Sequence, residues 1–532
     1  MTRLCLADSP ATGSKVCAEC HAEIARKYSR THMAVSSGVS GSGLFVPKFD
    51  KASFTDRHSV FGYSVGKDAD GYYFRFQKKG DQPSTRRLPY FVGSGAAASA
   101  FLIAVNGFLY QSPVTWYSRS ASWNLSPGYQ NYSYPFLTRA IAPGCLDCHA
   151  SGLQKIPGTQ NGYASPPFLE GGVGCERCHG PGAAHVARMR AGGQGSPAIL
   201  NPARMKPELR DSVCAQCHLS GVVRIDRPGS EHKPFVPGED FGSHGTAFVR
   251  AGDFLHTRVT SHVENLAQSA CKKSSGDRMW CGTCHDPHTV PSGAARTSWF
   301  REKCLACHAV KDCGAPQSLR AAKQDSCIAC HMPRNATVDA EHVVQTDHSI
   351  PRRLTPRAAP GPAADAALVP FGKKTASDRD LGLAYAIVAI REQNKIYAGR
   401  AFGLLKKALE GSPDDPLTLS YLADLYKKQA DDANAVRLYE RLLRADPLET
   451  SAPVALGAYA MERGDFQTAI RLWSDALRKS PALLLVRVNL AAALIRTGRV
   501  PEARAILITA LEFNPGFKAA QDLLETLRAK AP

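Results

Sequence analysis

The sequence predicts two structural classes in series: an amino-terminal part with little regular secondary structure and a small β-rich insert, followed by an all-α solenoid. Three observations predict this arrangement. Seven Cys-x-x-Cys-His motifs lie within residues 1–350, and 21 of the 43 aromatic residues lie within residues 44–140. From residue 378 onward, proline and alanine recur every 34 residues. A chain of 532 residues is too long for one ordinary core, so we expect two to four domains.

The seven motifs have the spacing that attaches haem covalently. Two cysteine sulfurs form thioethers with the porphyrin, and the adjoining histidine binds the iron as its proximal ligand. We therefore predict a multihaem cytochrome c domain at residues 1–350 with seven c-type haems. The predicted attachment residues are Cys17, Cys20, Cys145, Cys148, Cys175, Cys178, Cys214, Cys217, Cys281, Cys284, Cys304, Cys307, Cys327 and Cys330, and the predicted proximal ligands are His21, His149, His179, His218, His285, His308 and His331.

Two other uses of paired cysteines compete with haem. Zinc ribbons contain Cys-x-x-Cys pairs, and secreted domains use cysteines for disulfides. Neither explains why a histidine directly follows all seven pairs. The repeated five-residue pattern therefore favours haem.

The large positive net charge of the chain is weak evidence about the partners that it binds. The formal net charge is +18, and seven ferric haems with ionised propionates, at −1 each, reduce it to about +11. No basic run with interleaved aromatic residues is present, so we expect no nucleic-acid binding. A basic surface is better suited to attracting acidic redox partner proteins or anions.

Haem attachment also predicts where the protein works. Covalent c-type haem is attached outside the cytoplasm, so we expect a periplasmic or extracellular location. The segment Met1–Pro10 lacks the features of a signal peptide, and we expect the true start of the protein to lie upstream. No stretch approaches the roughly 18 apolar residues that cross a bilayer, so we expect no transmembrane segment.

The interval between the first two motifs is long enough to hold an extra structural unit. Successive motifs begin 128, 30, 39, 67, 23 and 23 residues apart. The runs Gly71–Phe76 and Phe101–Gln111 are strand-like, and Asn106-Gly107 inside the second run is a hairpin signal. We predict a β-rich insert at residues 44–140, with an irregular aromatic wrap as the alternative. Elsewhere in residues 1–350 we expect short helices, with haem replacing much of the core.

The carboxy-terminal part contains a regular repeat. Residues 351–377 hold five prolines and predict a linker or extended strap. Beyond it, the 34-residue series are Pro413, Pro447, Pro481 and Pro515, and Ala401, Ala435, Ala469 and Ala503. This pattern resembles tetratricopeptide repeats, in which small residues let paired helices approach. We predict a repeat domain at 378–532, with a degenerate repeat at 379–412, three repeats at 413–514 and a capping helix at 515–530.

Ten histidines outside the motifs are available as distal ligands of the seven irons. The surplus favours bis-histidine haems that transfer electrons over a haem with an open coordination site. The predicted distal ligands are His32, His58, His185, His262, His288, His342 and His348, with His256 as a substitute for His262. His232 and His244 lie in loops rich in glycine and proline, and we expect them to be mostly on the surface. Met33 and Met332 are alternative ligands that compete with nearby histidines.

Three cysteines lie outside the motifs. Outside the cytoplasm, Cys271 and Cys313 are candidates for a disulfide near the last three motifs. Cys5 would then be left over.

Several phrases resemble one known group of proteins. They include Gly174-Cys-Glu-Arg-Cys-His-Gly-Pro-Gly-Ala-Ala-His185, Cys281-Gly-Thr-Cys-His-Asp-Pro-His288, Cys327-Ile-Ala-Cys-His-Met-Pro and Thr346-Asp-His348. They resemble periplasmic multihaem cytochromes related to hydroxylamine oxidoreductase and octahaem tetrathionate reductase, especially relatives with carboxy-terminal tetratricopeptide repeats. The resemblance implies closely packed, mostly bis-histidine haems that relay electrons. It also supports His185, His288, His342 and His348 as distal ligands.

The resemblance does not carry catalysis over to this chain. Enzymes of that group depend on a special haem, often with a lysine as proximal ligand or a crosslinking tyrosine, whereas all seven motifs here end in histidine. We therefore expect an exported electron-transfer protein rather than an enzyme, with repeats that dock a partner or assemble copies of the chain, including into a filament. The alternatives are an oxidoreductase of small nitrogen or sulfur compounds at one five-coordinate haem, and a mainly structural assembly role.

Overall fold

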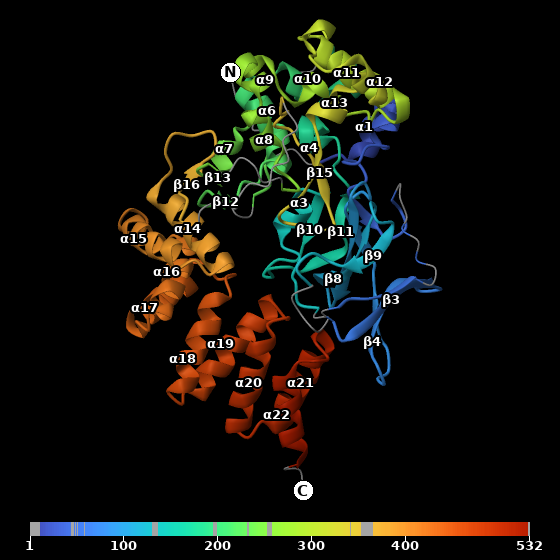
Figure 1. The fold of residues 1–532 in the computed structure, drawn as a ribbon. Coiled ribbons are helices and arrows are strands. Elements are labelled where there is room, and N and C mark those ends of the chain that lie inside the picture. The colour runs from blue at the N-terminus through green and yellow to red at the C-terminus, as the bar shows by residue number, and fades with distance from the viewer. Residues whose placement is uncertain are drawn as a thin grey trace.

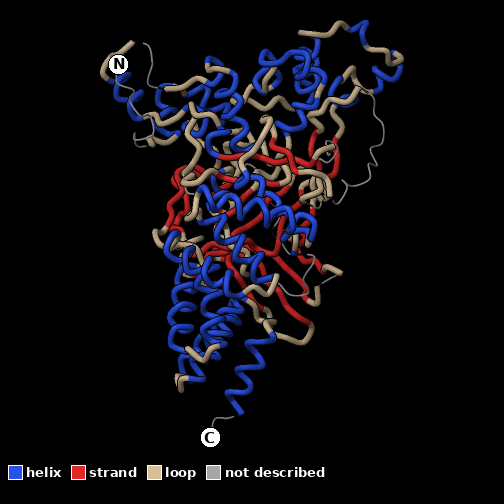
Figure 2. Tube along the Cα trace, turned by 90° about the vertical axis from the view of Figure 1, so that its left-hand side faces the viewer, coloured by secondary structure: helices blue, strands red, loops and turns tan. Residues whose placement is uncertain are grey.

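The structure is a computed structural model, and it describes residues 11–43, 47, 49, 52–57, 59–129, 137–194, 199–230, 233–252, 258–340, 342–352 and 365–529. Strands occupy the middle of the molecule, the helices that carry the motifs lie at one end, and the repeats lie at the other end (Figures 1 and 2). The described part therefore contains the helical solenoid and the β-rich region that the sequence predicts.

Two antiparallel sheets form the centre of the β-rich region. One has the order β1-β6-β7-β8-β9 and the other β2-β3-β4-β5. Their buried faces share a core that includes Phe74, Phe101 and Trp123. The strands are β1 (Ser37–Val39), β2 (Ala52–Thr55), β3 (Phe61–Asp68), β4 (Gly71–Lys78), β5 (Ser84–Arg87), β6 (Tyr90–Val92), β7 (Ala98–Val105), β8 (Phe108–Tyr117) and β9 (Ser122–Leu125).

The predicted hairpin at Asn106-Gly107 is confirmed. Val105 pairs with Phe108, and both turn residues have positive φ angles, 51° and 83°. That conformation suits Asn-Gly because neither residue is strongly disfavoured in it. The β structure also extends past residue 140 into β10 (Ala150–Lys155) and β11 (Tyr163–Gly171), which pair with each other.

Short helices carry the motifs, as the sequence predicts. They are α1 (Ser14–Cys20), α3 (Pro143–Asp147), α4 (Glu176–His179), α6 (Pro207–His218), α10 (Cys281–Cys284), α11 (Gly293–Leu305) and α13 (Cys327–His331). The intervening elements are α2 (Ala22–Tyr28), α5 (Ala183–Arg190), η3 (Pro202–Arg204), β12 (Val223–Asp226), α7 (Phe241–His244), β13 (Gly245–Arg250), α8 (His262–Gln268), α9 (Ala270–Ser275), η4 (Gly276–Arg278), η5 (Val310–Asp312), α12 (Gln317–Ala322), β14 (Arg334–Ala336) and β15 (Val344–Thr346).

Four helical hairpins and a final helix form the solenoid. Each hairpin buries the predicted small residues, such as Ala401 and Ala435, between its two helices. The helices are α14 (Asp378–Glu392), α15 (Lys395–Gly411), α16 (Pro416–Lys428), α17 (Asp432–Ala445), α18 (Ser451–Glu462), α19 (Phe466–Lys479), α20 (Leu484–Arg496), α21 (Val500–Phe513) and α22 (Lys518–Ala529). None of the described helices is long and apolar enough to cross a membrane.

The solenoid contacts the rest of the molecule near both of its ends. Part of the predicted linker forms β16 (Leu368–Pro370), which pairs with β13, and α14 packs against this sheet. Near the other end, Tyr110 and Phe513 bury their rings against each other at 5.4 Å, and the backbone N–H of Leu137 donates to the carbonyl of Phe513. The repeats are therefore fixed at one end to the β12-β13-β16 sheet and near the other end to the β-rich region.

Candidate haem centre

The motif helices bring each cysteine pair and its histidine to one place. Two cysteines three residues apart lie on the same side of a helical turn. In four motifs, the N–H of the following histidine donates to the carbonyl of the first cysteine at 2.9–3.0 Å, which holds the histidine at the end of that turn; these histidines are His21, His179, His285 and His308. Each such motif thus presents two sulfurs and an imidazole together.

Three motif histidines face a second imidazole at almost the same spacing. In each pair the second ring belongs to a predicted distal ligand. The pairs, with centroid distances and interplanar angles, are His21–His185 (6.4 Å, 16°), His179–His288 (6.0 Å, 15°) and His285–His348 (6.3 Å, 31°). Two imidazoles on opposite faces of one iron, with metal–nitrogen distances of about 2 Å, have centroids about 6 Å apart. The three pairs therefore fit bis-histidine haem.

The second ring nitrogens are also arranged as haem ligation requires. The Nδ1 atoms of His179, His331 and His348 lie 2.7 Å from the carbonyl of Leu200, 3.0 Å from that of Pro351 and 2.9 Å from that of Thr346. A carbonyl accepts, so Nδ1 carries the proton and Nε2 keeps its lone pair for a metal. Such a bond also fixes the orientation of a ligating ring.

Among the described residues, many of the helices around the motifs bury no side chain of their own. Nine of these described α-helices contain no buried residue at all; they are α1, α2, α4, α5, α9, α10, α11, α12 and α13. The helix α11 alone is 13 residues long. A folded region normally buries apolar side chains, so this one fits a group that supplies apolar surface from outside the chain. The residues present therefore fit haem.

Thiols from different motifs contact one another in pairs. The contacts join Cys17 to Cys175, Cys148 to Cys217, Cys214 to Cys281, and Cys304 to Cys327. Cys178 lies close enough to Cys214 to raise its pKa, and Cys284 has the same effect on Cys304. If the motifs are numbered along the chain, motifs one, three, four, five, six and seven are therefore neighbours in that order. Motif two lies beside motif four.

One predicted ligand, His262, lies among other histidines. Its Nδ1 is 3.3 Å from Nδ1 of His218, and its ring centroid is 4.8 Å from those of both His218 and His348. Burial, together with these neighbouring imidazoles, lowers the pKa of His262 to about 3. Burial likewise lowers the pKa of His285 to about 4. These rings are therefore neutral near pH 7, which is the state that binds a metal.

The structure places the other candidate ligands away from these pairs. The ring of His342 lies 4.9 Å from that of Tyr117, with Nε2 3.3 Å from Nδ2 of Asn124. His32 is on the surface. His244 is partly buried, and its Nε2 lies 2.5 Å from a carboxylate oxygen of Glu239. The predicted positions His58, His232 and His256, like Cys5, lie outside the described residues.

The expected disulfide between Cys271 and Cys313 is not formed, and both thiols are free. Cys271 lies on α9 near the motif sulfurs Cys284 and Cys304, whose pKa values it raises. Cys313 follows η5 and is exposed. Sequence proximity to the same motifs did not predict that the two thiols lie in different surroundings.

Two positioning residues escaped the sequence analysis. The carboxylate of Glu176 accepts from the backbone N–H groups of Thr12, Gly13 and Gly182 at 2.7–3.2 Å, which ties the first motif to the third. The hydroxyl of Tyr28 donates to the carbonyl of Val173 at 2.6 Å, and its ring lies 6.2 Å from that of His288. The only sequence signal for Glu176 is its position inside a motif.

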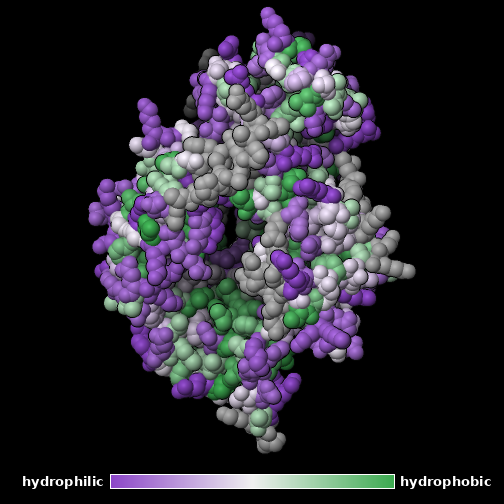
Figure 3. Space-filling view, viewed as in Figure 1, coloured by the Kyte–Doolittle hydropathy of each residue, from purple (hydrophilic) through white to green (hydrophobic). Residues whose placement is uncertain are grey.

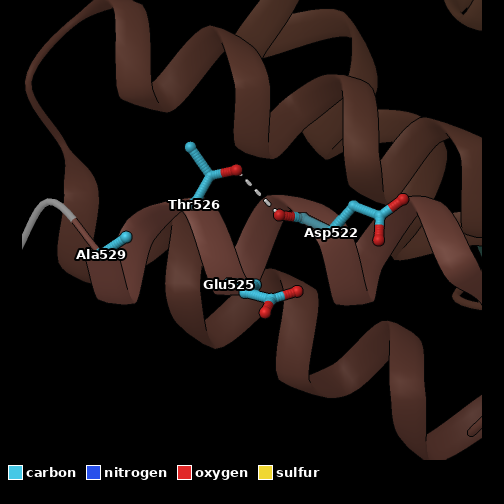
Figure 4. Close-up of a pocket in the computed structure, with 4 residues that line it drawn as sticks. All are labelled: Asp522, Glu525, Thr526 and Ala529. Carbon is cyan, nitrogen blue, oxygen red and sulfur yellow. Dashed lines mark hydrogen bonds between the residues drawn. The ribbon is translucent and has the colours of Figure 1, made fainter.

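Other metal or ligand sites are not evident in the described part of the chain. Among its residues, no group of three or more His, Cys, Asp or Glu side chains is placed to hold a metal ion without haem. An open pocket of about 420 Å³ lies on one face of α22, lined by Asp522, Glu525, Thr526 and Ala529 (Figure 4). It is at the end of the solenoid, far along the molecule from the motif helices (Figure 1).

Comparison with known proteins identifies two segments. Residues 127–180 match the family "Cytochrome c554 and c-prime", and residues 460–530 match the family "Tetratricopeptide repeat". The first match contains the second and third motifs. This part of the chain is therefore of the cytochrome c type, which implies covalently bound haem, and the chain ends in tetratricopeptide repeats.

Solved structures resemble the chain over a limited part of its length. A crystal structure of MamA is 19% identical and covers 26% of this chain and 81% of its own, with a TM-score of 0.24. A MamA structure labelled AMB-1 is 21% identical, covers 29% and 87%, and has a TM-score of 0.26. The first tetratricopeptide-repeat domain of Spaghetti (RPAP3) bound to an HSP90 peptide is 20% identical, covers 21% and 90%, and has a TM-score of 0.21. No curated protein matches the chain.

Proposed function

We propose that the protein is an exported seven-haem electron-transfer cytochrome, related to the hydroxylamine oxidoreductase and octahaem tetrathionate reductase group. The observation that carries this proposal is the set of three imidazole pairs at 6.0–6.4 Å. An iron held by two histidines has no free coordination position for a substrate, and this favours electron transfer over catalysis.

The arrangement of the motifs supports a relay. Each motif contacts at least one other through its thiols, from Cys17 at one end of the row to Cys327 at the other. Haem bound at these sites supplies irons that exchange single electrons. The chain holds the attachment sites next to one another and orients their ligands through backbone carbonyls.

The repeats provide a surface for a partner protein or another copy of the chain. The first helices of successive repeats, among them α18 and α20, lie next to one another. They leave Val454, Ala458 and Val488 only partly buried, and Leu485 is 67% exposed. Apolar side chains gather over this part of the molecule in Figure 3. Exposed apolar surface of this kind is typical of docking sites, and repeat solenoids commonly bind proteins.

A second candidate function is oxidation or reduction of small nitrogen or sulfur compounds at one five-coordinate haem. It is favoured by His149, which is partly buried and faces no second imidazole at the bis-histidine spacing among the described residues. An iron bound there without a sixth ligand would have an open position.

Spectroscopy of the purified holoprotein separates the two functions. Its intact mass and pyridine haemochrome absorbance should correspond to seven haems, and electron paramagnetic resonance should show low-spin ferric iron throughout. A high-spin signal that changes with nitrite, hydroxylamine or cyanide would favour the enzyme. A mass corresponding to fewer than seven haems would contradict the proposed cofactor content.

A further inference from the structure

The first motif ends the row of motifs, and the structure there fits bis-histidine haem. Its cysteine Cys17 contacts Cys175 of the third motif, the next in the row. Its histidine His21 faces His185 at a centroid distance of 6.4 Å and an interplanar angle of 16°. A relay exchanges electrons with other molecules at its ends, so the surface around this motif is a candidate docking surface.

Six exposed basic side chains lie around the first motif, on or next to α1, α2 and α5, and we call them the basic patch. The segments 11–30 and 183–190 that carry them contain two acidic residues, so the net charge of these segments is +4. A ferric haem with ionised propionates, at −1, leaves a net charge of about +3. The members of the basic patch are Lys15, Arg26, Lys27, Arg30, Arg188 and Arg190.

Two ion pairs lie within the basic patch and do not neutralise it. Nη2 of Arg190 lies 2.7 Å from Oε2 of Glu19, which connects α5 to α1. On α2, Nζ of Lys27 lies 2.8 Å from Oε1 of Glu23, and α1 contacts α2. Among the residues that the structure describes, no carboxylate forms an ion pair with the other four members of the basic patch. Their charges are therefore available to a partner.

Two further carboxylates near α1 are bound to the backbone. Glu170 accepts from the backbone N–H and from the hydroxyl of Ser14. Glu176 accepts from several backbone N–H groups, including that of Gly182 at 2.7 Å. Both carboxylate side chains are partly buried, whereas the members of the basic patch are exposed. The charge that this surface presents to solvent is therefore mainly positive.

Apolar side chains are exposed within the same surface. Ile24 lies two residues before Arg26 on α2 and is 48% exposed. Met189 lies between the two arginines of α5 and is 42% exposed. A surface that combines apolar contacts with surrounding charge of one sign suits an interface in which electrostatics steers the encounter of two proteins.

We infer that the basic patch docks an acidic redox protein that exchanges single electrons with the haem of the first motif; this inference rests on the proposed haem-binding function. In one transfer, the reduced cofactor of the partner loses one electron and ferric iron becomes ferrous, and no bond forms or breaks. Positive charge attracts such a partner and raises the association rate. An anionic membrane would also meet positive charge here, but the patch surrounds a motif whose histidines fit iron ligation, which favours a redox protein.

The test measures how fast reduced flavodoxin, an acidic protein with a flavin cofactor that donates single electrons, reduces the haems of the full-length holoprotein. The variant Arg26→Glu/Arg188→Glu reverses two charges of the basic patch. The matched control, Lys311→Glu/Lys323→Glu, makes the same change in net charge at two exposed lysines near the sixth and seventh motifs, toward the other end of the row. Haem content, the low-spin signal and the extent of reduction by dithionite should be unchanged in both variants.

The rates should differ between the two variants at low ionic strength. The second-order rate constant should fall at least about tenfold in Arg26→Glu/Arg188→Glu and by less than about threefold in the control. The difference should disappear in about 1 M salt, which screens exposed charges.

Three outcomes would contradict the inference or its premise. Equal rate losses in both variants would show that net charge alone matters, and unchanged rates would remove the docking role. Loss of binding to phosphatidylglycerol vesicles in Arg26→Glu/Arg188→Glu, without a change in the flavodoxin rate, would assign the basic patch to a membrane surface. Absence of haem from the unaltered protein would instead contradict the proposed function.

Discussion

Each predicted distal histidine that forms a ring pair follows a motif different from the one it faces. His185 follows the third motif and faces His21 of the first, and His288 follows the fifth motif and faces His179 of the third. His348, after the seventh motif, faces His285 of the fifth. Single side chains thus join segments far apart in the sequence, and the loss of one should affect a motif that is distant along the chain.

Replacing His185 by alanine should convert one low-spin haem to high-spin while seven haems remain attached, because His185 faces His21 across the space of an iron. His342→Ala is the control. His342 contacts Tyr117 and Asn124 rather than a motif histidine, so its loss should leave the spin state unchanged. Electron paramagnetic resonance of both variants measures the spin states. A new high-spin signal in His342→Ala, with none in His185→Ala, would make His342 the iron ligand in place of His185.

At the scale of elements, the repeats show why a small residue recurs at one position of each first helix. Ala423, Gly457 and Ala491 are 34 residues apart and buried. Gly457 differs from the other two because Trp473 of the paired helix α19 occupies the space of its side chain, with Nε1 donating to the carbonyl of Val454 at 3.1 Å. A Cβ on residue 457 would lie 2.4 Å from that Nε1 atom.

The variant Gly457→Ala should therefore destabilise the repeats by about 1–3 kcal/mol, since the indole must move and lose its hydrogen bond. Gly403→Ala is a matched control on α15, where an added Cβ meets nothing within 4 Å. It should raise stability by about 0.5–1 kcal/mol because alanine favours the helix. Urea unfolding measures both free energies, and equal effects of the two changes would contradict this packing argument.

At the scale of the whole molecule, contacts near both ends of the solenoid connect it to the rest of the chain. At the first end, Arg379 and Arg391 of α14 donate to the carbonyls of Asp226 and Val222, each at 2.9 Å. Near the other end, Phe513 is 3% exposed and packs on Tyr110. A partner docked on the repeats is thereby held in a fixed orientation to the motif region.

Replacing Phe513 by alanine should lower the free energy of unfolding by about 3–5 kcal/mol and loosen the solenoid from the β-rich region. Ile508 lies on the same helix and is 50% exposed. Ile508→Ala should change stability by no more than about 0.5 kcal/mol. Denaturant unfolding and limited proteolysis of the two variants provide the measurement, and equal stability losses would show that the Phe513 contact is unimportant.

Sequence patterns predicted those parts of the molecule that depend on neighbouring residues. The hairpin at Asn106-Gly107, the strand at Gly71–Lys78 and the helical hairpins of the repeats all follow from short or periodic patterns. The pairing of β16 with β13 and the separation of Cys271 from Cys313 did not. Those features depend on how segments more than 40 residues apart pack, and no local pattern contains that information.

The sequence by itself determined the chemistry that the chain can support. Seven Cys-x-x-Cys-His motifs define the predicted attachment residues, and the 34-residue period indicates the solenoid, because both are local patterns along the chain. Only the tertiary structure decided which histidines meet. It brings His185, His288 and His348 opposite motif histidines and sets His262 beside His218 at hydrogen-bonding distance, because ligand geometry depends on contacts between remote segments.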